Sequence, residues 1–196
     1  MEVLSMKVPA NALVFDTGPL RHFAMQGWLG VLRYLAEDRP VFIPDSVERE
    51  LNRTIEYASP VRAVLDADWI NVHRSNDLSY VEAFARYADR LAVGGWRLAV
   101  GDKNIGECGV LAMGHVYGCE VVLDDATPRR IAEEVGIRAT ATISLLCKGI
   151  RMKRLTIDMV ECLADHLLEG EYYLPFRRGE FRQHVLENGL IDYDEI

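Results

Sequence analysis

The sequence predicts an α/β fold in which a central parallel sheet is covered by helices on both faces. Short apolar runs alternate with helical patterns over roughly the first 150 residues, which is typical of a parallel sheet. The apolar runs lack a polar face, as expected for strands that are covered on both sides. The remaining residues carry only helical patterns. We therefore expect an α/β domain over residues 1–150 and a helical C-terminal extension, residues 151–196, packed on the same domain.

The predicted strands are short apolar runs, and several of them end at turn-forming or acidic residues. The run "ALVF" leads into Asp16 and Gly18, "PVFIP" is bracketed by prolines, and "CEVVLDD" ends in two acids. The segments "DWINVH" and "IRATAT" are further candidates. The predicted strands are residues 12–15, 40–44, 68–73, 119–125 and 137–142.

The predicted helices have apolar residues at helical spacing, and several begin or end at recognisable capping residues. Asp45 and Glu48 have the spacing of a capping box. Asn104 is the expected N-cap of a second helix, and a third is expected to have Thr127 as its N-cap and to end at Gly136. Residues 94–103 resemble a loop and are hard to place. The predicted helices are residues 27–38, 45–55, 59–67, 77–93, 104–118, 127–136, 143–150, 156–170 and 175–189.

Composition and charge indicate a soluble protein. The chain has 196 residues, of which 49% are hydrophobic, and its formal net charge is −8. It contains no apolar run long enough to cross a membrane, and its N-terminus lacks the basic and apolar regions of a signal peptide. We therefore expect a cytoplasmic protein without a membrane partner. The negative charge argues against broad, non-specific nucleic-acid binding but is compatible with acids that hold cations.

The four cysteines do not form the close pairs that a zinc site requires. Each lies in an apolar stretch, and free cysteine is buried like a small hydrophobic residue. We expect reduced thiols in the core at Cys108, Cys119, Cys147 and Cys162.

Acidic residues occur where a parallel sheet places its functional sites. Asp16 follows one predicted strand, and Asp124 and Asp125 follow another, so they lie at the carboxyl edge of the sheet. Glu50 and Glu107 lie near the starts of helices that can approach the same edge. Carboxylates that converge repel one another unless protons or cations are present, and oxygen ligands favour Mg²⁺ or Mn²⁺. The matching chemistry is metal-assisted hydrolysis of a phosphodiester.

Each of these acids also has a purely structural interpretation. Asp16 could cap the turn at Gly18, and Glu107 could be a capping partner at the start of its helix. Asp124 and Asp125 could form Asx-turns, and Glu50 could lie on a solvated helix face. The Asp-Thr-Gly triplet at residues 16–18 also occurs in aspartic proteases, but those enzymes pair two triplets in an all-β fold. A haloacid-dehalogenase-like phosphatase would need a second Asp at position 18, which is glycine.

Two stretches resemble the PIN-domain family. "LVFDTGPLRHF" followed by "VFIPDSVEREL" is similar to its opening, with Pro44, Val47, Glu50 and Leu51 matching the form P-x-x-V-x-x-E-L. "IGECGVLAMGHVYGCEVVLDDATPRRIAEEVG" is similar to the second half of one branch, which includes the double acid after a strand. The resemblance covers about residues 11–150.

The resemblance implies a three-layer α/β/α fold and a ribonuclease that depends on Mg²⁺ or Mn²⁺, and the family includes VapC-type toxins. By position, it implies catalytic and metal-binding roles for four acids. Thr17 would support them, and Asp125 is an alternative metal ligand. Gly109 stands where this branch often has a second acid, which leaves the number of metal ions open. The resemblance also implies an RNA substrate, an antitoxin partner and a homodimer. The four acids are Asp16, Glu50, Glu107 and Asp124.

Cationic side chains near the acids are candidates for contact with the RNA backbone. Arg129 and Arg130 have the strongest case because they follow the double acid directly; a second group lies near residue 150, and a third comprises Arg177 and Arg178. Solvated helix ends are the structural alternative for all of them, and His22 is a weaker candidate. The second group comprises Arg151, Lys153 and Arg154. The alternative function is a PIN-fold module that binds RNA or a protein partner with little or no catalysis.

Overall fold

A computed structural model describes residues 7–74, 77–91 and 104–195. Within these ranges, five parallel strands form one sheet in the order β3-β2-β1-β4-β5. Val14 in the central strand is paired with Phe42 on one side and with Val121 on the other. All five predicted strands are present, although each is shorter than predicted, β4 and β5 most of all. The strands are β1 (Leu13–Phe15), β2 (Val41–Pro44), β3 (Ile70–His73), β4 (Glu120–Val122) and β5 (Ala139–Thr140).

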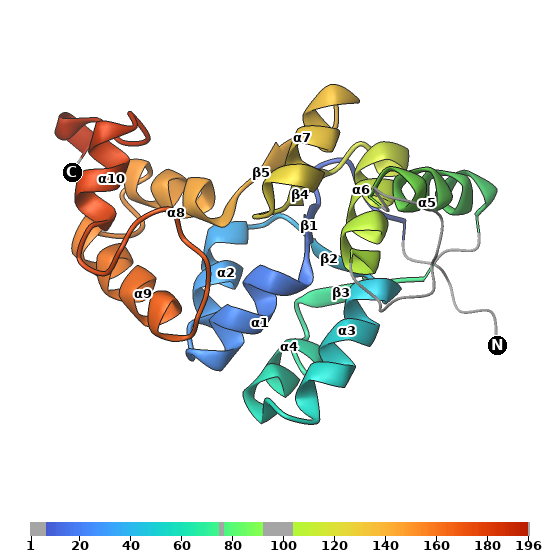
Figure 1. The fold of residues 1–196 in the computed structure, drawn as a ribbon, viewed down its shortest axis with the longest axis horizontal. Coiled ribbons are helices and arrows are strands. Elements are labelled where there is room, and N and C mark those ends of the chain that lie inside the picture. Colours follow the sequence, from blue (N-terminus) through green and yellow to red (C-terminus); the bar gives the residue numbers. More distant parts are fainter. Residues whose placement is uncertain (1–6, 75–76, 92–103, 196) are drawn as a thin grey trace.

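Helices cover both sides of the sheet, which gives the α/β/α arrangement that the sequence predicts. Helices α1, α2 and α8 lie on one side, and α5 and α6 lie on the other (Figure 1). The helices in the N-terminal half of the chain are α1 (Thr17–Met25), α2 (Leu29–Ala36), α3 (Asp45–Ile55), α4 (Arg62–Leu65) and α5 (Leu78–Leu91). Those that follow are α6 (Ile105–Tyr117), α7 (Ala126–Glu134), α8 (Thr142–Arg151), α9 (Ile157–Glu169) and α10 (Phe181–Glu187).

The core is centred on β1 and on helix α6, which packs against it. Leu13, Val14 and Phe15 are all buried, as expected for a central strand covered on both faces. Helix α6 is buried along most of its length, from Gly106 to Gly114 with few interruptions. A helix that is apolar all round belongs in the interior, so the sequence of α6 fixes its place beside the sheet.

Two capping predictions are wrong. Helix α3 begins at Asp45 itself, and Pro44 occupies the N-cap position. Strand β2 runs directly into the helix there, so Asp45 is already helical; Glu48 pairs with Arg74 instead of closing a capping box. Helix α7 begins at Ala126 with Asp125 as its N-cap, so Thr127 is already helical and is not the N-cap.

Other boundary predictions are confirmed. Asn104 is the N-cap of α6, although its side chain makes no capping hydrogen bond. Gly136 follows α7 with a positive φ of 75°, a conformation that favours glycine at the end of a helix. The predicted loop at residues 94–103 lies outside the described residues.

The C-terminal segment lies beside α1, α2 and α8 (Figure 1). Trp28 donates a hydrogen bond to His166 of α9 at 3.1 Å, so the segment contacts the α/β region directly. Helix α8 runs across residue 150, and the division of the chain at that residue stays a prediction.

Cys162 corrects the prediction for the cysteines. Cys108, Cys119 and Cys147 are buried and free, as expected, but Cys162 is free and exposed on α9. Apolar neighbours of Cys162 in the sequence, such as Leu163 and Ala164, are buried on another face of the helix. In the described part of the chain, no helix is long and apolar enough to span a membrane.

Candidate metal centre

The strand order creates a crevice between β1 and β4. The chain leaves β1 toward β2 and β3 on one side and returns through β4 on the other side. In open α/β sheets, ligands bind at such a switch point, outside the carboxyl ends of the strands. Asp16 follows β1 and Asp124 follows β4, so both lie at this crevice.

Asp16 lies at the start of α1 but makes no capping hydrogen bond with its side chain. Its Oδ1 atom is shielded from solvent and has no hydrogen-bond partner among the described residues. Burial raises the pKa of the Asp16 carboxyl well above its usual value, and the nearby charges of Glu107 and Glu50 raise it further. A buried, unsatisfied carboxylate oxygen is costly unless a proton or a cation neutralises it.

Glu50 is held in place by groups from two other elements. Thr17 of α1 donates a hydrogen bond from its hydroxyl to Oε2, and the Gly106 amide donates to Oε1 at 2.9 Å. A Cβ atom on Gly106 would lie 2.8 Å from Glu50 Oε2 and 3.0 Å from Asp16 Oδ1. Both carboxylates therefore approach the same backbone position, and a larger residue there would require them to shift.

Glu107 follows Gly106 in the first turn of α6 and is half-buried. Burial raises the pKa of the Glu107 carboxyl, and the charges of Glu50 and Asp125 raise it as well. Glu107 also contributes to the raised pKa of Asp16. The structure thus brings Asp16, Glu50 and Glu107 into one electrostatic group.

The two acids after β4 have different surroundings. Asp124 accepts hydrogen bonds from the Thr142 amide at 2.7 Å, from the Thr142 hydroxyl at 2.8 Å, and from the hydroxyl of Tyr172. Asp125 is exposed at the N-cap position of α7 and makes no capping hydrogen bond with its side chain. Asp124 is therefore satisfied by protein donors, whereas Asp125 interacts with Glu107 through its charge.

Tyr172 is a site residue that the sequence analysis missed. It lies after α9, is buried, and contacts the ring of His22 at a centroid distance of 4.8 Å. His22 in turn lies 3.1 Å, through Nδ1, from the Gly170 carbonyl oxygen. Burial raises the pKa of Tyr172 well above its usual value, and the charge of Asp124 adds to this shift. No local pattern marks Tyr172, because its partner is 48 residues away.

Gly109 has a packing reason for being glycine. A Cβ atom there would collide with Ser46 Oγ and would lie 2.9 Å from the side chain of Pro44. Position 109 therefore faces the junction of β2 and α3. A second acid at this position would require α6 to move away from that junction.

Several of the predicted RNA-contacting residues have partners within the protein. Arg129 donates to the carbonyl of Asp124 at 2.7 Å and to that of Leu123 at 3.2 Å, which ties α7 to the end of β4. Arg151 donates to the Leu190 carbonyl at 3.2 Å. Arg130 and Lys153 are exposed.

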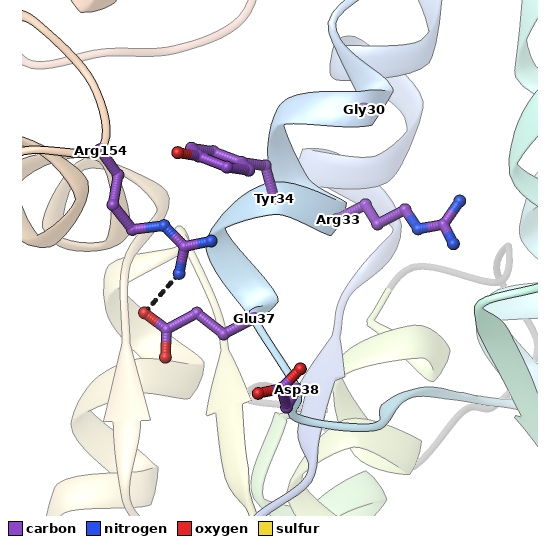
Figure 2. Close-up of a pocket in the computed structure, with 6 residues that line it drawn as sticks. All are labelled: Gly30, Arg33, Tyr34, Glu37, Asp38 and Arg154. Atoms are coloured by element: carbon purple, nitrogen blue, oxygen red, sulfur yellow. Dashed lines mark ion pairs between the residues drawn. The ribbon is translucent and has the colours of Figure 1, made fainter.

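Arg154 contacts residues at the edge of the sheet opposite the one that carries the acids. It forms an ion pair with Glu37 at 2.7 Å, and its guanidinium stacks 4.2 Å from the centre of the Tyr34 ring (Figure 2). Glu37 precedes β2, so this contact is at the amino edge of the sheet, opposite the carboxyl edge with Asp16. Arg178 of the third predicted group pairs with Glu169 at 2.7 Å.

The fit of a divalent cation can be judged from the acids themselves. The unsatisfied Oδ1 of Asp16, the approach of Glu50 to the same glycine, and the raised pKa values of Asp16 and Glu107 all fit a site for a hard cation. Among the described residues, no three His, Cys, Asp or Glu side chains are already close enough together to form a complete metal site. Of the predicted ligands, Asp16 and Glu50 are the two whose carboxylates approach one backbone position, that of Gly106.

Comparison with known proteins identifies the family. The family model DUF3368, described as a PIN domain, matches residues 12–180. The chain therefore belongs to the PIN-domain family, whose members are generally nucleases. The match extends beyond residue 150 and includes Tyr172.

One of the solved structures that match this chain has a distant similarity in fold. It is the crystal structure of VapBC2 from Rickettsia felis bound to a DNA fragment from their promoter. The matched chain is 11% identical, with a TM-score of 0.45, and the match covers 66% of this chain and 98% of that one. The search of curated proteins found no match.

Proposed function

We propose that this protein is a ribonuclease that hydrolyses RNA phosphodiester bonds with the help of Mg²⁺ or Mn²⁺. The observation that carries the proposal is the approach of Asp16 and Glu50 to Gly106 at the sheet's switch point, with Glu107 beside them. Family membership supports the nuclease class, and the all-carboxylate donor set favours hard divalent cations.

Asp16, Glu50 and Glu107 are the proposed metal-binding acids. Thr17 and the Gly106 amide orient Glu50, so that its carboxylate is fixed before any ligand arrives. Between the acids after β4, the contacts favour Asp125 as the one that faces Glu107, and they favour a positioning role for Asp124. When bound, the divalent ion would lower the pKa of an attacking water and stabilise charge on the leaving oxygen.

The direct test is cleavage of single-stranded RNA with and without EDTA, in parallel with Asp16→Asn. Asp38→Asn is a matched control, because Asp38 is an exposed acid at the opposite edge of the sheet (Figure 2). We expect Mg²⁺- or Mn²⁺-dependent cleavage by the parent and by Asp38→Asn, and a loss on the order of 10²-fold or more in Asp16→Asn. Cleavage by Asp16→Asn at the parental rate would contradict the proposal.

A second candidate function is a PIN-fold module that binds RNA or a protein partner with little catalysis. Two features favour it: Gly109 stands where the branch that this chain resembles often has an acid, and the described residues do not form a ready group of three metal ligands. Calorimetric titration with Mn²⁺ distinguishes the two functions, because the module predicts neither metal binding nor cleavage. An antitoxin partner and a homodimer rest on the family resemblance alone, and a cytoplasmic location rests on the composition of the sequence.

A further inference from the structure

A polar hollow of about 220 Å³ lies directly beside the candidate metal centre. Glu50 forms part of its wall and is at the same time held by Thr17 and Gly106 on the side of the acids. Glu50 therefore borders both the hollow and the group of acids. Its lining residues are Ser46, Arg49, Glu50, Arg53 and Ile105.

Two arginines bring positive charge to this hollow. Arg49 and Arg53 are four residues apart on α3, so they lie on the same face of the helix. The side chain of Arg49 is 60% exposed, and its ion pair with Asp45 spans 3.4 Å within the same helix. Exposed ion pairs of this kind contribute little, so a stronger anion can compete for the guanidinium.

We propose that Arg49 and Arg53 bind a backbone phosphate of single-stranded RNA next to the bond that is cleaved. This inference rests on the proposed function and adds the binding site for the substrate. A strand that passes the acids must cross the neighbouring surface, and the surface on the Glu50 side presents these two arginines. Arginine matches a phosphate with two parallel N–H donors, which gives position as well as affinity.

The charge of the whole chain makes such a local site necessary. A net charge of −8 repels a polyanion at long range, so productive contacts must come from a few well-placed cations. Of the candidates that the sequence offered, Arg129 and Arg154 direct their donors to carbonyls and to Glu37. Arg130 and Lys153 are exposed but do not line the hollow beside Glu50. Arg49 and Arg53 were not distinguished by sequence, because nothing in the local pattern places them beside Gly106.

The size of a hollow does not identify the site. A larger one, of about 570 Å³, contains Arg33, Tyr34 and Arg154 at the opposite edge of the sheet (Figure 2). There, Arg154 already pairs with Glu37 and stacks on Tyr34. This hollow supplies an internal control, because Arg33 is 62% exposed and has only a weak ion pair, at 3.9 Å, with Asp68.

The test is the binding of a short fluorescein-labelled single-stranded RNA by fluorescence anisotropy in the presence of EDTA. The variants are Arg49→Ala with Arg53→Ala, and Arg33→Ala as the matched control. We expect the double variant to bind about tenfold more weakly, and the slope of log affinity against log salt to fall by about 0.7, since each neutralised phosphate of a single strand contributes about 0.7. Arg33→Ala should retain both the affinity and the slope of the parent.

The outcomes separate this inference from the proposed function. Because binding is measured without metal, a parent that binds but does not cleave would leave the inference standing while the ribonuclease proposal fails. Equal binding by the parent and the double variant, or no RNA binding by the parent, would overturn the inference. Circular dichroism of each variant checks that the fold is retained, which we expect because alanine is a good helix former on an exposed face.

Discussion

Asp16 and Asp124 occupy equivalent places in the sheet and have opposite surroundings. Each follows a buried strand, and the two strands, β1 and β4, are neighbours. Asp16 has an oxygen that no described group satisfies, and it is repelled by Glu107 and Glu50. Asp124 accepts hydrogen bonds from Thr142 and Tyr172.

The difference shows how one residue type at one edge of a sheet can take two roles. A carboxylate that is satisfied by protein donors stabilises the fold, because removing it leaves those donors without an acceptor. A carboxylate that is buried against other carboxylates lowers stability until a cation or proton neutralises it. The fold therefore places an acid with satisfied oxygens, Asp124, and an acid with an unsatisfied oxygen, Asp16, on either side of the crevice.

The largest effect is expected when the satisfied acid is removed. Asp124→Ala leaves the Thr142 amide and the Tyr172 hydroxyl without their acceptor, and should lower the free energy of unfolding by about 3 kcal/mol. Asp125→Ala is the control, because Asp125 is exposed, and should change stability by less than about 0.5 kcal/mol. Urea denaturation measures both. Equal stability of the two variants would mean that the hydrogen bonds to Asp124 do not stabilise the fold.

The second prediction concerns Gly106, which the carboxylates of Asp16 and Glu50, two of the proposed metal ligands, both approach. A methyl group at Gly106→Ala would press on Glu50 and Asp16, and should weaken Mn²⁺ binding on the order of 10- to 100-fold, as displaced supporting groups do. Gly30→Ala is the control. Gly30 lies in α2 with no neighbouring atom near its added Cβ, so the change should leave metal affinity intact and stabilise the helix by about 0.5–1 kcal/mol. Calorimetry distinguishes the two variants.

The smallest expected effect is a gain in the stability of the metal-free protein when the charge of Asp16 is removed. Asp16→Asn removes a buried charge and should raise the free energy of unfolding of the metal-free protein by about 1 kcal/mol. The folded state raises the pKa of Asp16, so its ionisation costs nothing below the unfolded pKa and increasingly destabilises the parent as pH rises toward the folded pKa. The advantage of the variant should therefore grow with pH in thermal unfolding. An advantage that shrinks as pH rises would contradict the raised pKa.

Much of the fold could be predicted from sequence because its signals are local. The alternation of apolar strands and periodic helices identified all five strands and the α/β class. The ends of the helices and strands were predicted less accurately. Asp45 looked like an N-cap only because the sequence could not show that β2 continues into α3 without a turn. Cys162 looked buried because its neighbours are apolar, although it lies on the exposed side of α9.

The sequence by itself determined the class of fold, the family resemblance and the acids at the strand ends, because strand-ending acids and helical periods are properties of short segments. Only the tertiary structure decided which acids meet. It placed Gly106 between Asp16 and Glu50, brought Tyr172 to Asp124 across 48 residues, and filled the space beside Gly109 with Ser46. Such contacts depend on how helices pack across the sheet, and neighbouring residues in the sequence carry no signal of that packing.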